Sequence, residues 1–118
     1  MAYEYTEMNV AQAADGGDKS SAFEYSESLA AAGDSKSVLI PDDVKSIAVT
    51  AQGADGATAT IHTTTDPVSV VKSGTGVTWI AWSFGAVTTA IGAIFAPVTA
   101  IKMVQANAGT SKITLRVQ

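Results

Sequence analysis

The sequence predicts an all-β protein: an antiparallel β-sandwich or jelly-roll-like barrel of about eight short strands with an extended N-terminal arm. Short runs alternate apolar and polar residues, turn-forming residues separate these runs at spacings of about 8 to 12 residues, and no helical stripe of comparable length competes with them. A chain of 118 residues fits one domain with a modest core. We therefore expect a flexible acidic arm over residues 1–20 and a β-sandwich domain over residues 21–118.

The predicted arm combines small and acidic residues with two tyrosines and ends in a glycine pair flanked by Asp15 and Asp18. A glycine pair in this setting marks a flexible turn, and the segment has too little apolar surface to order on its own. Stretched out, such a segment would span on the order of 65 Å, enough to reach an adjacent subunit.

Residues 21–33 admit two interpretations. Ser21 and Glu24 fit a capping box at the start of a helix. Phe23 and Tyr25, in contrast, alternate with smaller and polar residues at a period of two, which is typical of a strand. We favour the strand.

The next strands are indicated by clearer alternation. A short β run over residues 37–40 ends at a proline, and residues 47–52 and 57–62 each alternate apolar and polar positions. Between the last two runs, residues 53–56 supply the residues that adopt positive φ in tight turns. This combination predicts a hairpin.

Further β runs follow, each introduced by a turn. They cover residues 68–71, 77–82, 98–106 and 112–117. In the last run, Ile113, Leu115 and Val117 should face inward, while Lys112, Thr114 and Arg116 face outward.

Charge is segregated along the chain. Residues 1–35 hold seven acids and one base, for a net charge of −6, whereas residues 36–118 hold four acids and six bases, for a net charge of +2. Opposite fields of this kind steer the acidic leader of one copy toward the basic body of another. The pattern favours a protein built for assembly.

No sequence pattern brings together the residues that catalysis or cofactor binding needs. The chain has no cysteine, and its one histidine, His62, falls on the polar side of its run, where we expect a solvated side chain. Asp42 and Asp43 are adjacent, so in extended chain they would point to opposite sides. No nucleophile elbow, phosphate loop or calcium loop is complete. We expect no enzyme and assign no catalytic, cofactor-binding or metal residue.

Nucleic acid and membrane are not expected partners. A net charge of −4 with scattered bases offers no dense patch for phosphates. Residues 73–101 contain no charge, but glycines, a proline and hydroxyl side chains interrupt them, which favours buried strands and loops over a spanning helix. A membrane-active protein using this segment is the weakest alternative.

The aromatic residues are the candidate contact residues. Trp79 and Trp82 differ in parity on a strand, so one ring can enter the core while the other covers the second face or a partner. Two interpretations follow: Trp79, Trp82 and Phe84 all belong to the core, or Trp82 and Phe84 anchor an interface or stack on a sugar. In and after the arm, further anchors could dock on a neighbour. The predicted interface residues are Tyr3, Tyr5, Phe23, Tyr25, Trp82 and Phe84.

Several short motifs in residues 21–118 resemble those of a group of small structural proteins of tailed bacteriophages. The motifs are Ile40-Pro41, Val44 to Val49, Thr64-Thr65-Asp66-Pro67, Trp79-x-x-Trp82-x-x-Gly85-x-Val87 and Pro97-Val98-Thr99-Ala100-Ile101. The resemblance implies a compact β domain on a capsid or tail, either as a head-decoration (cement) protein or as a fibre-like attachment.

Together these observations predict a non-enzymatic phage virion structural protein, a capsid decoration protein that bridges capsid subunits. Its expected partners are copies of itself in a homo-oligomer and the major capsid protein or another virion protein. The first residues form no secretory signal, so we expect synthesis in the host cytoplasm and location in the virion. The alternative is a carbohydrate- or receptor-binding module of a tail fibre or spike.

Overall fold

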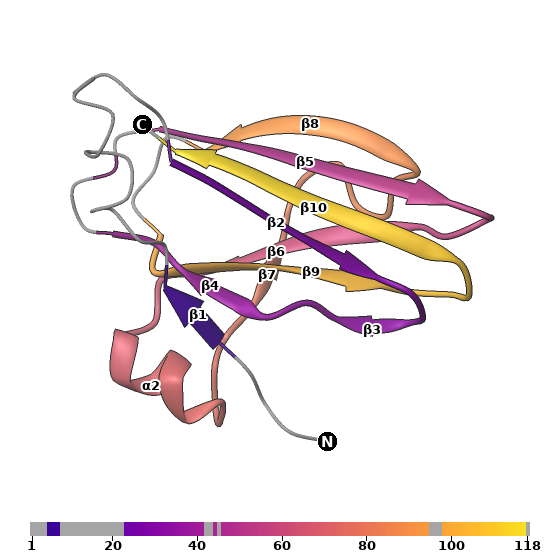
Figure 1. Ribbon diagram of the computed structural model, residues 1–118. Helices are drawn as coiled ribbons and strands as arrows, with labels where there is room; N and C mark the ends of the chain where they lie inside the picture. Colours follow the sequence, from indigo (N-terminus) through magenta and orange to yellow (C-terminus); the bar gives the residue numbers. More distant parts are fainter. Residues whose placement is uncertain (1–4, 8–22, 42–43, 45, 95–97, 118) are drawn as a thin grey trace.

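The computed structural model describes residues 5–7, 23–41, 44, 46–94 and 98–117. These residues form two β-sheets packed face to face, with one short helix outside them (Figure 1). The predicted all-β sandwich is therefore confirmed.

The larger sheet has six strands in the described residues. Five of them follow the order β1-β4-β9-β6-β7, and β3 pairs with β9 beside that path. All pairs are antiparallel except β1 with β4, which is parallel. The strands are β1 Tyr5–Glu7, β3 Gly33–Asp34, β4 Ser37–Leu39, β6 Ala59–Thr64, β7 Ile80–Ala81 and β9 Ala100–Gln105.

The smaller sheet has four antiparallel strands in the order β2-β10-β5-β8. They are β2 Phe23–Leu29, β5 Ile47–Ala54, β8 Thr89–Ile94 and β10 Thr110–Val117. β2 pairs with β10 along its whole length, from Phe23 opposite Val117 to Leu29 opposite Ser111. The strand interpretation of this ambiguous segment is confirmed.

The core lies between the two sheets. Alternate residues of β5 and β10 are buried and their neighbours are more exposed, as the period-two pattern predicts. These inward side chains meet those of β4, β6 and β9 from the other sheet. The buried cluster comprises Val38, Ile47, Val49, Ala51, Ala59, Ile61, Ile101, Met103, Ile113, Leu115 and Val117.

The turn after β5 has the expected conformation but does not form a hairpin. Asp55 and Gly56 have φ values of 58° and 87°, and the Ala57 N–H donates to the Ala54 carbonyl at 3.1 Å. β5 pairs with β10 and β8, however, whereas β6 pairs with β9 and β7. The hairpin prediction is wrong because turn residues reverse the chain without deciding which sheet the next strand joins. The connection from β9 to β10 crosses between the sheets in the same way.

A helix occupies the segment where a β run was expected. α2, Val68–Ser73, follows Pro67 and ends at Gly74, whose left-handed φ of 72° lets its N–H donate to the carbonyls of Val70 and Val71. The strand prediction is wrong here because proline before the segment and glycine after it favour a short helix over the β preference of valine.

α2 packs on the outer side of the six-stranded sheet (Figure 1). Val71 is its buried residue and forms a second apolar cluster with Leu39 and Ala100, on which Val77 and Trp79 also pack. The β run predicted over residues 77–82 is therefore reduced to the two residues of β7, because its first part covers this cluster instead.

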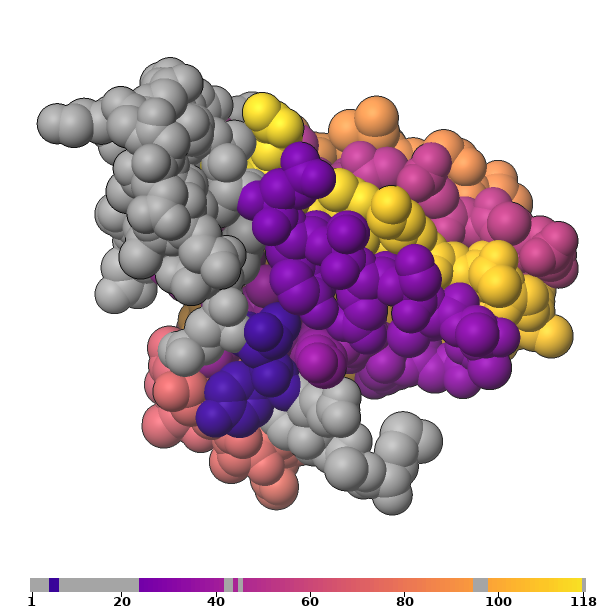
Figure 2. All heavy atoms as spheres, viewed as in Figure 1, coloured from indigo at the N-terminus to yellow at the C-terminus, as the bar shows by residue number. Residues whose placement is uncertain are grey.

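Part of the predicted arm lies within the sheet. Tyr5–Glu7 form β1 and pair with residues 37–39 of the same chain. In Figure 2, β1 (indigo) and β2 (purple) lie on the same visible face. The rest of the predicted arm, including Tyr3, lies outside the described residues, as do Asp42 and Asp43.

Candidate functional site

The outer face of the four-stranded sheet is covered mainly by short polar side chains. Alternation places Lys112, Thr114 and Arg116 of β10 on this face, as predicted from the sequence. Arg116 forms an ion pair with Glu24 of β2 at 3.3 Å, and both side chains are more than half exposed. A pair so exposed adds little to stability.

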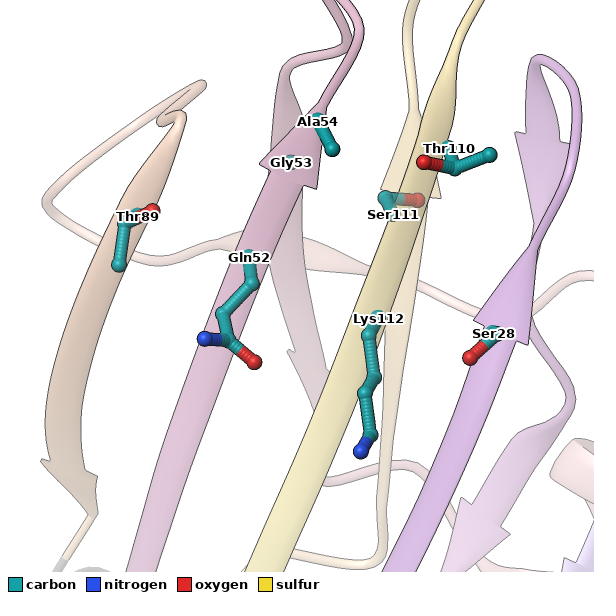
Figure 3. A pocket seen from close by; sticks show the side chains of 8 residues that line it. All are labelled: Ser28, Gln52, Gly53, Ala54, Thr89, Thr110, Ser111 and Lys112. Atoms are coloured by element: carbon teal, nitrogen blue, oxygen red, sulfur yellow. The ribbon is translucent and has the colours of Figure 1, made fainter.

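A shallow pocket of about 320 Å³ lies on this face (Figure 3). Every strand of the sheet contributes to it; the lining residues are Ser28, Gln52, Gly53, Ala54, Thr89, Thr110, Ser111 and Lys112. Hydroxyl, amide and ammonium groups dominate its polar edge, and Gln52 lies directly opposite Lys112 in the register. Such groups suit a polar ligand bound by hydrogen bonds, although the volume is at the lower limit of about 300 Å³ for ligand pockets.

A buried amide supports one side of this pocket. Gln105 at the end of β9 is 2% exposed and donates from Nε2 to the carbonyls of Asn107 and Gly109, both at 2.8 Å. Its Oε1 accepts a hydrogen bond from the Ser111 hydroxyl. All hydrogen-bonding groups of the amide side chain are used, which fixes the turn between β9 and β10.

Asn107 connects the two turns that cross between the sheets. Its Oδ1 accepts from the Thr58 N–H at 2.8 Å, and its Nδ2 donates to the Gly56 carbonyl at 2.8 Å. We call the pair of turns, residues 54–58 and 106–110, the arch end. The pocket therefore borders the arch end, whose two turns are held together by the hydrogen bonds of Asn107.

The predicted aromatic pair, Trp82 and Phe84, lies in the connection between β7 and β8. Each of these two strands is an edge strand of its own sheet. Trp82 packs on the main core and donates from its indole N–H to the Gly85 carbonyl at 2.7 Å. Phe84 meets it edge to face, with 5.1 Å between ring centroids and 83° between ring planes. Gly92 of β8 makes room for both rings, since an added Cβ would lie 3.1 Å from Phe84 and 3.2 Å from Trp82.

Three large apolar side chains remain exposed near these two strands. They are Ile80 of β7 at 60%, Phe84 at 55% and Ile91 of β8 at 70%. The sequence analysis singled out Phe84 but neither isoleucine. The exposed position of Ile91 could be found only from the register of β8 with β5, because that run has no apolar and polar alternation.

Two of the other predicted interface residues, Tyr5 and Tyr25, contact their own chain. The Tyr5 ring lies 5.7 Å from the Lys72 ammonium of α2. Tyr25 packs against the main core, and its hydroxyl donates to Glu27 at 2.6 Å. Phe23 is the first residue of β2. The structure thus brings Trp82 and Phe84 together but not these tyrosines.

A charged cluster lies on the outer face of the six-stranded sheet. Lys102 of β9 contacts Asp34 at 2.8 Å, and its ammonium lies 4.7 Å from the centre of the Trp79 ring. His62 lies opposite Lys102 in the register. The lysine is therefore engaged by both an anion and an aromatic face.

His62 is half-buried, not solvated as the sequence suggested. Pairing with β9 on one side and β7 on the other encloses part of the imidazole, and its Nδ1 makes no hydrogen bond to the described residues. Burial, and secondarily the charge of Lys102, lowers the pKa of His62 below 6.5, while Asp34 opposes the shift. The imidazole is neutral at neutral pH.

The described part of the chain contains no group of three or more histidine and acidic side chains placed to hold a metal ion. Within the same residues, no helix has the length and apolar character to cross a bilayer. No family model, curated protein or solved structure matches this chain. The phage resemblance is carried by the short sequence motifs alone.

Proposed function

We propose that this chain is a non-enzymatic structural protein that coats a larger protein lattice, specifically a capsid decoration (cement) protein of a phage virion. The observation that carries the proposal is the exposure of Ile80, Phe84 and Ile91, which lie on or between the edge strands β7 and β8. Large apolar side chains exposed on a small domain favour contact with another protein surface.

The segregated charge supports the same proposal. The leader, residues 1–35, carries a net charge of −6 and the remaining residues carry +2, and opposite charges of this kind can steer copies of the chain toward one another. A decoration protein bridges subunits, and a second contact strengthens binding because the first contact raises its effective concentration. Many weak contacts would then reinforce a shell.

The test is the location and copy number of the chain in virus particles. Immunogold labelling of particles purified from producing cells should mark heads in many copies. In a binding assay with undecorated heads, Phe84→Ser combined with Ile80→Ser should weaken attachment, whereas Val68→Ser, at an exposed residue of α2, should not. Particles that never carry the chain would contradict the proposal.

The pocket favours one alternative, a carbohydrate-binding module of a tail fibre. Its hydroxyl and amide lining can exchange hydrogen bonds with sugar hydroxyls. Binding on a glycan array that disappears in Gln52→Ala would support this function. Loss in Phe84→Ala with retention in Gln52→Ala would instead locate the sugar at the aromatic pair.

A further inference from the structure

Among the described residues, β8 is an edge strand without the usual protection against pairing. It is the last strand of the four-stranded sheet, and its sequence, Thr-Ala-Ile-Gly-Ala-Ile, has no charge and no proline. Its register with β5 is continuous, so no bulge interrupts it. β2, at the opposite edge, carries Glu24 and Glu27. Charges, prolines and bulges are the features that keep edge strands from pairing with other chains.

The register identifies the backbone groups on the free side of β8. The Gly53 N–H donates to the Thr88 carbonyl, so the residue pair 53 and 88 is hydrogen-bonded. Because hydrogen-bonded and non-bonded pairs alternate in antiparallel sheets, residues 90, 92 and 94 direct their backbone groups to β5. The backbone groups of Thr89, Ile91 and Ala93 therefore point away from the sheet.

We propose that β8 pairs in antiparallel orientation with β8 of a second copy of this chain, about a two-fold axis at Ile91. The two four-stranded sheets then form one continuous sheet of eight strands. Ile91 lies opposite Ile91 of the second copy, and Thr89 lies opposite Ala93 of the second copy. The inference rests on the proposed function only in its claim that like copies assemble.

The position of the two-fold axis follows from the backbone groups on the free side of β8. An axis at Ile91 gives all three outward-directed residues of β8 a partner. The free row cannot extend toward the N-terminus, because the N–H and carbonyl of Val87 already bond to Ala59 at 2.8 and 2.9 Å. Within β8, centres displaced by one residue would leave one outward-directed residue without a partner.

A second copy fits this edge because the edge is compatible with itself. A two-fold interface uses the same residues twice, so each must tolerate its symmetry mate. Two Ile91 side chains, 70% exposed in the single copy, would cover each other on the outer face. No like charges meet, since β8 has none and Lys112 and Arg116 lie on β10, beyond β5.

The pairing should be weak in isolation. One strand pair with a few side chains falls below the roughly 1,200 Å² of stable interfaces, so we expect a dimer that forms with increasing concentration. On a lattice, the same contact would gain from neighbouring attachments. β8 (orange) lies at the rim of the molecule in Figure 2, where such a neighbour could reach it.

Single-cysteine variants of the full chain provide a direct test, because the chain has no cysteine of its own. Directly opposed residues of a hydrogen-bonded pair have Cα atoms about 5.5 Å apart, within the roughly 4.4–6.8 Å that disulfides span. Mild oxidation should therefore convert Ile91→Cys into a covalent dimer. Ile80→Cys, at another exposed isoleucine on the other sheet, should stay monomeric. Equal cross-linking of both variants, or none at Ile91→Cys, would overturn the inference.

The register is tested with two further variants. Thr89→Cys and Ala93→Cys should each cross-link poorly alone, because neither residue meets its own symmetry mate. An equimolar mixture of the two should give the mixed dimer. Efficient dimerisation of Thr89→Cys alone would overturn the proposed axis.

A charge substitution tests the noncovalent contact. Ile91→Lys places two ammonium groups opposite each other and should raise the dissociation constant at least tenfold in sedimentation equilibrium, while Ile80→Lys leaves it unchanged. Thermal unfolding shows that both variants are folded. A dimer that survives Ile91→Lys would overturn the inference.

The proposed function and this inference can fail separately. If Ile91→Cys cross-links but the chain is absent from virus particles, only the proposed function is refuted. If the chain is present on particles but Ile91→Cys does not cross-link, only this inference is refuted.

Discussion

At the scale of single residues, the buried amide of Gln105 determines the shape of the arch end. It satisfies two backbone carbonyls and the buried hydroxyl of Ser111. Gln105→Leu would leave these groups unpaired, so the free energy of unfolding should fall by about 1–3 kcal/mol. Denaturant titration measures the change. Gln52→Leu, on the exposed outer face, should change it by less than about 0.5 kcal/mol, and equal losses in both variants would contradict this role.

His62 gives the stability a defined pH dependence. Because its pKa is lowered in the folded protein, the unfolded chain binds the proton first as the pH falls below 6.5. The contribution of the neutral imidazole is thus fully present above pH 6.5 and declines as the pH approaches the lower folded pKa. The unfolding midpoint should drop less between about pH 7.5 and about pH 5.5 in His62→Gln than in the parent. Identical drops would contradict it.

The position of His62 also shows what the sequence could and could not reveal about residues. Alternation placed it correctly on the side of β6 away from the core. It could not show that the six-stranded sheet continues on both sides of β6 and encloses the imidazole. The pocket was missed for the same reason, since its small polar residues come from four separate strands.

At the scale of elements, α2 depends on one buried valine. Val71 is fully buried in the second cluster, whereas Val68 of the same helix is 45% exposed. Burying a valine contributes about 1.5 kcal/mol or more, so Val71→Ala should lower the free energy of unfolding by about that amount. Val68→Ala should have almost no effect. Chemical denaturation of both variants tests the difference, and similar losses would mean that the helix does not pack as described.

The elements differ in how far local sequence determines them. β2 and β5 were predicted because their alternation matches a sheet with one buried face. α2 was not, because three valines favour a strand while the deciding residues, Pro67 and Gly74, lie outside the segment. β8 was not predicted because it has apolar or small residues on both faces. Local sequence can show that a segment is a strand. The sheet that the strand joins depends on the distant strand with which it pairs.

At the scale of the whole molecule, two kinds of association should respond differently to salt. Attraction between the acidic leader and the basic body is screened over about 10 Å at 0.1 M salt. Strand pairing at the uncharged β8 is not electrostatic. Raising the salt to about 0.5 M should therefore weaken higher oligomers of the full chain but not the cross-linking of Ile91→Cys. Light scattering and gel analysis separate the two, and parallel loss of both would contradict independent contacts.

β10 lies in the middle of its sheet, between β2 and β5, although it is the last of the described strands along the chain. During translation, β2 and β5 leave the ribosome long before residues 110–117 that must join them. The four-stranded sheet therefore cannot close until residues 110–117 have emerged. Until β10 emerges, the nascent chain exposes its core-forming side chains, which makes it a substrate for chaperones at that stage.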